Sequence, residues 1–146
     1  IAFLSNLIHL DLITDSFEID RNKVGPRGAC HFGKLTSLVK LDLWDNFVGS
    51  EGAKAISKIA TLKWLDVNKN HICDEGARAL SRMKDLEYAD LGSVIHNSDN
   101  NHFSSVGLCW LGRLNHIRTI KLWFRHFPKW PYQVLTMRLP KQIKID

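Results

Sequence analysis

Hydrophobic and polar residues alternate over short stretches of the chain, and each such stretch leads into a segment with a different spacing. In LVKLDLW, which begins at Leu38, every second residue is apolar over a few positions, and this predicts a half-buried strand. In the following GSEGAKAISKI, Ala53, Ile56 and Ile59 are spaced as on one face of a helix. This part of the chain is therefore predicted to form a strand, a turn and a helix.

The same unit recurs along the chain. The stretch that starts at Leu35 aligns without a gap with the stretch that starts at Ile59, 24 residues later, and a further unit begins at Met83. The units that begin at Leu4 and Met83 are 31 residues long, because each carries seven extra residues after its strand. Units of this size cannot bury their apolar faces alone, so the period predicts a stack of coils that share one core.

The repeated pattern LxxLxLxxN, followed by NxVGxEGAxxI, resembles the leucine-rich repeat, and in particular its short ribonuclease-inhibitor-like and bacterial GALA variants. The resemblance covers about 120 residues. It implies a right-handed α/β solenoid with a parallel concave sheet and outer helices. We expect about five coils over residues 1–122 and an aromatic, basic cap or tail over residues 123–146.

Three polar columns are expected to serve the scaffold. An asparagine follows each strand, and its amide can pair backbone groups where one coil passes to the next. Ser50 and Asp74 precede Glu51 and Glu75, a pattern typical of helix N-caps. A basic residue ends each helix, where it meets the negative end of the helix dipole. The asparagines are Asn22, Asn46, Asn70 and Asn101, and the basic residues are Lys34, Lys58, Arg82 and Arg113.

Residues that flank the buried leucines of each strand should point away from the core. Four of them, Asp11, Asp42, Asp66 and Asp90, would form an acidic ladder beside aromatic residues. Two interpretations stay open. Aspartate is common at this position of the repeat and hydrogen-bonds across strands, or the aspartates recognise a basic, Arg-bearing partner together with exposed aromatic rings. The predicted partner contacts are Lys40, Asp42, Trp44, Trp64, Asp66, Tyr88, Asp90, Lys121 and Trp123.

The positive charge of the chain is concentrated at its C-terminus. The whole chain carries +5, but residues 1–112 carry −2 and residues 113–146 carry +7. Aromatic and basic residues are interleaved after Leu122, and two interpretations stay open: bulky residues that cap the open end of a solenoid, or a segment that contacts nucleic acid, an anionic surface or another subunit. The basic tail contacts would be Arg125, Lys129, Trp130 and Arg138.

The two seven-residue insertions lie within ITDSFEIDRN and GSVIHNSDNN, and their polar composition predicts surface loops. These loops would either border the concave face or be tolerated insertions. No GxSxG, HExxH, P-loop or CxxC motif occurs, and the seven histidines are scattered over different repeat positions, so we expect no catalysis. We expect no cofactor, and no metal either, because carboxylates in register converge poorly on one cation.

Other features of the sequence bear on membrane insertion and on the cellular compartment. No run of about 18 apolar residues occurs, so no transmembrane segment is predicted. Three cysteines without CxxC spacing favour an intracellular, reducing compartment. We expect a non-catalytic scaffold that binds a protein on its concave face. The alternatives are a structural subunit of a ribonucleoprotein or membrane-associated assembly, held by its C-terminus, and, by resemblance, the substrate-recognition arm of an F-box ubiquitin ligase or a bacterial effector.

Overall fold

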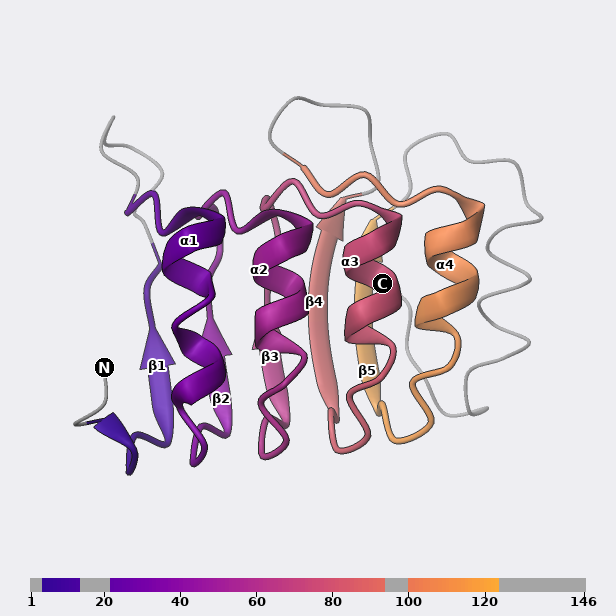
Figure 1. Ribbon diagram of the computed structural model, residues 1–146. Helices are drawn as coiled ribbons and strands as arrows, with labels where there is room; N and C mark the ends of the chain where they lie inside the picture. The colour runs from indigo at the N-terminus through magenta and orange to yellow at the C-terminus, as the bar shows by residue number, and fades with distance from the viewer. Residues whose placement is uncertain (1–3, 14–21, 94–99, 124–146) are drawn as a thin grey trace.

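The computed structural model describes residues 4–13, 22–93 and 100–123, and strands and helices alternate along them (Figure 1). The strands are β1 (His9–Asp11), β2 (Lys40–Asp42), β3 (Trp64–Asp66), β4 (Tyr88–Ser93) and β5 (Thr119–Trp123). The helices are α1 (Gly25–Ala29), the 3-10 helix η2 (Phe32–Lys34), α2 (Gly49–Ile56), α3 (Asp74–Leu80) and α4 (Ser105–Leu111).

The five strands form one parallel sheet in the order of the sequence, β1-β2-β3-β4-β5. From β1 to β4, equivalent residues of successive coils pair in register, so that Leu41 lies opposite Leu65 and Leu65 opposite Ala89. Between β4 and β5 the register shifts after Asp90, so that Gly92 pairs with Leu122 and Ser93 with Trp123. The helices lie side by side on one face of this sheet (Figure 1). The predicted α/β solenoid, with a parallel sheet and outer helices, is confirmed. None of the helices in the described ranges is long and apolar enough to cross a membrane.

The core lies between the sheet and the helices. Leucines from the strands, such as Leu41 and Leu65, are fully buried against Ile56 and Leu80 from the helices. The helices can approach closely because their inward positions hold small residues. A Cβ atom added to Gly52 of α2 would lie 2.7 Å from the Cβ of Ala29 in α1, which is closer than real Cβ atoms come. This contact explains the recurring EGA sequence at the helix starts.

The asparagine column joins consecutive coils, as predicted. Asn70 Oδ1 accepts hydrogen bonds from the backbone N–H groups of Asn46 at 3.2 Å and Val48 at 3.0 Å in the preceding coil. Asn70 Nδ2 donates to the carbonyl oxygens of Leu43 and Asn68 at 2.7 and 2.8 Å. Asn70 is fully buried, so these bonds satisfy backbone groups that water cannot reach.

The predicted N-caps at Ser50 and Asp74 are wrong. Helix α2 begins at Gly49 and α3 at Asp74 itself, and neither side chain caps its own helix. Both side chains instead bond to the following coil. Ser50 Oγ accepts the N–H of Cys73 at 3.0 Å, and Asp74 Oδ1 accepts the N–H of Ser104 at 2.8 Å. The cap prediction considered one coil alone and could not include the neighbour that supplies these donors.

Candidate partner-binding face

The strand face is the side of the sheet that faces away from the helices. Parallel pairing places equivalent residues of successive strands side by side on it. In one column Lys40 lies opposite Trp64, and Trp64 opposite Tyr88. In the next column Asp11, Asp42, Asp66, Asp90 and Lys121 follow one another across the sheet. In the described part of the chain, no helix covers this face (Figure 1).

The aromatic residues of this face form a stacked row. The rings of Trp64 and Tyr88 are parallel within 2°, with their centroids 4.9 Å apart. The Lys40 ammonium lies 4.4 Å from the centroid of Trp64, and the Lys121 ammonium lies 5.7 Å from that of Tyr88. Each such contact contributes about 0.5–1 kcal/mol at an exposed site. The rings are partly buried rather than exposed as predicted, because they cover one another and carry lysines.

Trp44 is held in the same way by a residue that the sequence analysis did not select. The ammonium of Lys69 lies 4.4 Å from the Trp44 ring centroid. Lys69 lies in the turn after β3, and its backbone φ of +53° is in the left-handed region. No periodic signal marked this residue, because its position depends on the turn geometry and not on the strand pattern.

Each of three aspartates accepts a hydrogen bond from the backbone N–H two residues later, at the end of β2 and β3 for Asp42 and Asp66 and within β4 for Asp90. Asp42 Oδ1 accepts the backbone N–H of Trp44 at 3.2 Å, and Asp66 Oδ1 accepts that of Asn68 at 2.9 Å. Asp90 Oδ1 accepts the N–H of Gly92 at 3.1 Å. Each hydrogen bond therefore closes a local turn between the aspartate and the residue two positions later. The expectation that the aspartates hydrogen-bond across strands is wrong, because the N–H groups that they accept belong to the same coil, two residues after each aspartate.

Burial changes the charge of the aspartate ladder. The pKa of Asp66 is raised from 3.8 to about 7, mainly by desolvation and in part by the neighbouring carboxylates of Asp90 and Asp42, against the hydrogen bond from Asn68. Desolvation also raises the pKa of Asp42, which is 6% exposed, and of Asp90, which is 9% exposed. Lys121 lies 3.9 Å from Asp90 and opposes this shift. At neutral pH the ladder is thus less negative than its sequence suggests.

Eight of the predicted contact residues share this face: Lys40, Asp42, Trp44, Trp64, Asp66, Tyr88, Asp90 and Lys121. Trp123 belongs to β5 through its backbone, which pairs with Ser93, and its side chain lies outside the described part. The tail residues Arg125, Lys129, Trp130 and Arg138 also lie outside the described residues, as do residues 14–21 and 94–99 of the two insertions.

The face also contains a close approach between coils that involves two further residues. Gly92 has a backbone φ of +68°, and a Cβ atom there would lie 1.9 Å from Asn68 Oδ1. Asn68 thus occupies the space that a larger residue would need in the next coil. Among the described residues, no group of three His, Cys, Asp or Glu side chains is placed to hold a metal ion. What this face presents is rings, lysines and partly protonated carboxylates.

Comparison with known proteins agrees with this architecture. A family profile described as "Leucine Rich repeat" matches residues 34–57 and 58–81, which are two consecutive units of 24 residues. No curated protein matches the sequence. Among solved structures, the chain is similar to "Leiomodin-1 Actin-Binding Site 2 (ABS2)", with a TM-score of 0.61 and 16% sequence identity. The alignment covers 92% of this chain and 79% of that one, and at this identity it shows a shared fold.

Proposed function

Because the chain is a leucine-rich repeat protein, we propose that it is a non-catalytic scaffold that binds a protein partner on its strand face. The supporting observation is the ordered row of Lys40, Trp64 and Tyr88 beside the aspartate ladder. Aromatic residues are enriched at protein interfaces. Rings that are already stacked lose little conformational freedom when a partner covers them.

The chemistry of the face favours a partner that presents arginine. A guanidinium stacks on aromatic rings and also pairs with a carboxylate in a planar, two-point contact. Trp64 and Tyr88 lie one column away from Asp66 and Asp90, so one arginine side chain can use both kinds of group. The lysines that now cover the rings would be displaced, and they can move because their side chains are long and flexible.

The neighbour's printed name assigns actin binding to that part of leiomodin-1. The likeness supports our proposal only in that the same fold presents a surface to a protein there. For this chain, the partner is proposed from surface chemistry alone. In the first alternative, a subunit docked through residues 123–146, the main contact lies outside the strand face. In the second, a recognition arm of a ubiquitin ligase or effector, the consequence of binding arises in another part of the assembly.

The test is an affinity capture with quantitative mass spectrometry. The bait is the full chain, either unchanged or with Trp64→Ala and Tyr88→Ala together. Loss of two central aromatic contacts should lower recovery of a genuine partner at least about 30-fold, since even one such residue contributes about 2 kcal/mol or more at an interface centre. A matched control carries Arg27→Gln and Lys54→Gln, two exposed changes on the helix side of the sheet.

A third bait, truncated after Leu122, separates the proposal from its alternative. Proteins that bind the strand face should be retained by the truncated chain and by the control, and lost with the two-ring variant. Recovery that depends on the C-terminus and not on Trp64 and Tyr88 would contradict the proposal. It would favour docking through the tail.

A further inference from the structure

A second surface of the solenoid has a different chemistry. The helix-to-strand edge consists of the four turns that lead from the end of one helix to the next strand, residues 34–39, 58–63, 82–87 and 113–118. These turns carry seven Lys or Arg residues and two acidic residues, a net charge of +5. The basic residues are Lys34, Lys58, Lys63, Arg82, Lys84, Arg113 and Arg118, and all seven are exposed.

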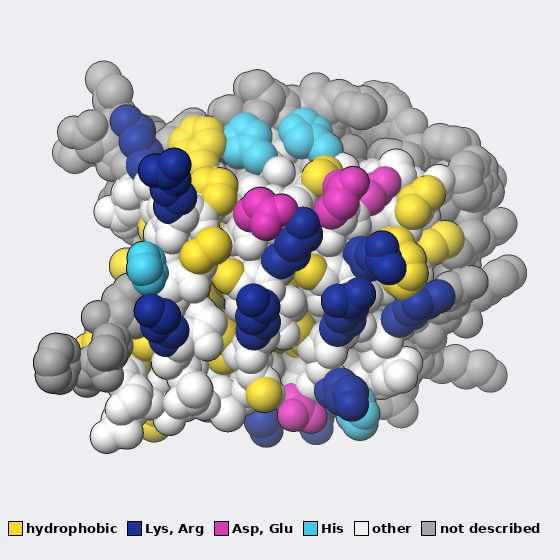
Figure 2. All heavy atoms as spheres, viewed as in Figure 1, with side chains coloured by type: hydrophobic (Ala, Val, Ile, Leu, Met, Phe, Trp, Pro, Cys, Tyr) yellow, Lys and Arg dark blue, Asp and Glu magenta, His cyan; other side chains and the backbone are white. Residues whose placement is uncertain are grey.

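The basic residues at the helix ends form a row without charge partners. Figure 2 shows Lys and Arg side chains lined up across the lower ends of the helices, seen from the helix side. Within the described part of the chain, no ion pair or side-chain hydrogen bond involves Lys34, Lys58, Arg82 or Arg113. The helix dipole accounts for a basic residue at each helix end. It does not account for the further cations nearer the strands.

The strand-side cations are only partly compensated. Lys63 Nζ lies 3.2 Å from Glu87 Oε1, and Arg118 Nε lies 3.4 Å from Glu87 Oε2, so two cations share one carboxylate. Such exposed pairs are weak and contribute little to stability. The edge as a whole therefore keeps an excess of positive charge over the width of at least three coils.

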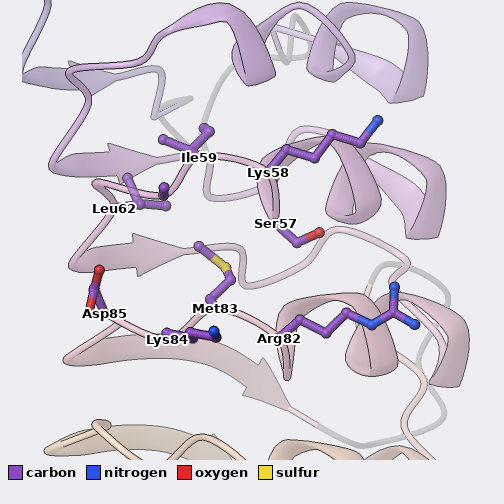
Figure 3. A pocket seen from close by; sticks show the side chains of 9 residues that line it. Ser57, Lys58, Ile59, Leu62, Arg82, Met83, Lys84 and Asp85 are labelled. Atoms are coloured by element: carbon purple, nitrogen blue, oxygen red, sulfur yellow. The ribbon is translucent and has the colours of Figure 1, made fainter.

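Two hollows open on this edge, and Asp85 borders both. The first, of about 180 Å³, is bordered by the cations Lys58, Arg82 and Lys84, and the rest of its lining is Ser57, Asp85 and the apolar residues Ile59, Ala60, Leu62 and Met83. Figure 3 shows Lys58 and Arg82 extending in the same direction from consecutive coils, with Ser57 between them. The second, of about 370 Å³, is lined by Lys63, Asp85, Glu87, His116 and Arg118. Each hollow is several times larger than the ~30 Å³ that one water occupies, so each has room for a phosphate group. Only the first has an excess of positive charge, because two carboxylates balance the two cations of the second.

The composition of the helix-to-strand edge indicates which class of anionic ligand it could bind. The four turns contain no Phe, Tyr or Trp, and their one ring is the exposed imidazole of His116, so they offer little on which nucleic acid bases could stack. The exposed large hydrophobic residues of the described part, Leu4, Ile8, Ile13 and Val106, all lie outside these turns. The edge thus has no large exposed apolar side chain to insert into a hydrocarbon layer. What it offers is a group of long, exposed cations, one of which, Arg113, lies with its guanidinium 4.1 Å from the centroid of the Trp110 ring.

The shape of the edge fits a plane of negative charge better than a single polymer strand. The turns are aligned along one side of the solenoid (Figure 1), and their cations occupy both the helix side and the strand side of that edge. A two-dimensional basic patch of this kind complements the negative head groups of a membrane leaflet. Lysine and arginine stems are long enough to let their charges reach such a plane.

We propose that the helix-to-strand edge docks the protein reversibly onto an anionic phospholipid surface, with a head-group phosphate in the hollow that Lys58, Arg82 and Lys84 border. The contact is electrostatic and lies at the plane of the head groups. Because the edge runs along the side of the sheet, the strand face stays open to a protein partner while the edge is engaged. The proposal does not depend on the strand-face function.

The experiment measures sedimentation of the full chain with vesicles of phosphatidylcholine that contain about 30% phosphatidylserine, at about 0.1 M salt. The edge variant carries Lys58→Gln, Arg82→Gln and Arg113→Gln. The matched control carries Arg27→Gln, Lys54→Gln and Arg78→Gln, which remove equal charge from the last turns of α1, α2 and α3. Any contribution of the basic C-terminus is the same in both variants.

We expect the edge variant to lower the vesicle partition coefficient about 100-fold, since each cation near an anionic surface contributes about fivefold. The control should stay within about fivefold of the unchanged chain. Asp85→Asn, which removes a negative charge between the two hollows, should raise binding about fivefold. This gain cannot arise from misfolding, and thermal unfolding curves check the loss variants.

Several results would overturn the proposal. One is equal binding to vesicles of pure phosphatidylcholine, and another is an equal loss in the edge and control variants. A third is an Asp85→Asn variant that binds no better than the unchanged chain. Single-stranded RNA serves as the competing ligand: if the edge variant loses RNA binding and keeps vesicle binding, the edge is a nucleic acid surface instead.

Discussion

At the scale of single residues, Asp66 shows how position in the sheet sets ionisation. Its carboxylate accepts the N–H of Asn68 at 2.9 Å, which favours the charged form. Burial opposes this hydrogen bond and dominates, so that the pKa rises to about 7. The same carboxyl in an unfolded chain ionises near its ordinary value of 3.8. Folding therefore takes up a proton wherever the pH lies between these two values.

This proton uptake predicts a loss of stability with rising pH. Between about pH 4 and pH 7 the folded state binds more protons than the unfolded state, so the free energy of unfolding falls as the pH rises and levels off above pH 7. The decrease from this one group should be on the order of a few kcal/mol. Asp66→Asn keeps an oxygen to accept the Asn68 N–H, and it should flatten the curve and be more stable than the unchanged chain at pH 8.

Urea unfolding at a series of pH values measures this effect. Asp85→Asn is the control, because Asp85 is exposed and lies on the helix-to-strand edge, away from the ladder. It should keep the slope of the unchanged protein. Parallel curves for Asp66→Asn and the unchanged chain would show that Asp66 is ionised in the folded state at low pH. A protonated Asp66 would also pair less strongly with an arginine of the partner. The affinity for such a partner should therefore rise as the pH increases through 7.

At the scale of elements, consecutive helices are joined by side chains that cross from one coil to the next. Asp74, at the start of α3, accepts the N–H of Ser104 at 2.8 Å and contacts the Ser104 hydroxyl through its other oxygen. Ser104 in turn caps α4 by accepting the N–H of Val106 at 3.1 Å. The start of α4 is thus ordered by a residue that lies 30 positions earlier in the chain.

Asp74→Ala should therefore destabilise α4 more than α3. We expect a loss of about 1–2 kcal/mol, the range found for a lost cap or charged hydrogen bond. Amide hydrogen exchange should show faster exchange in residues 105–111, with α1 unchanged. Glu51→Ala is the control, because Glu51 is an exposed first-turn acid whose partner, Lys54, is also exposed. A loss of protection confined to α3 would show that Asp74 supports its own helix.

At the scale of the whole molecule, the coils differ in how completely they are covered. Leu65, in the central strand, is fully buried between two neighbouring coils. Leu10 occupies the same column in β1, and it is only partly buried because no described strand pairs with the outer edge of β1. Leu4, Ile8 and Ile13 near that edge are about half exposed. A solenoid gains stability from each interface between coils, so its ends are weaker than its middle.

The two leucines form a matched pair for a stability measurement. Leu65→Ala should lower the free energy of unfolding by about 2–5 kcal/mol, because the cavity lies between coils on both sides. Leu10→Ala should cost less than half as much, since its site is already open to solvent. Urea unfolding followed by circular dichroism measures both. Equal losses would mean that the stack unfolds as one unit in which the first coil is as well covered as the third.

The sequence by itself determined the architecture. The 24-residue period, the apolar columns and the asparagine at each strand end predicted a parallel sheet, its register from β1 to β4 and the asparagine ladder, because these features repeat from coil to coil. They did not predict the register shift between β4 and β5 after Asp90. It also placed Lys40, Trp64, Tyr88 and Asp66 on one face, since alternation along a strand decides which side a residue takes.

Only the tertiary structure decided what these residues do to one another. Three features depend on a neighbouring coil, which a single repeat does not contain. They are the hydrogen bond of Asp74 to the next coil, the contact of Lys69 with the Trp44 ring and the partial burial of Trp64. The raised pKa of Asp66 has the same origin, because desolvation comes from the packed neighbours and not from the residue type. Periodicity carries the information about which side a residue faces, whereas distance and burial arise only when the coils are stacked.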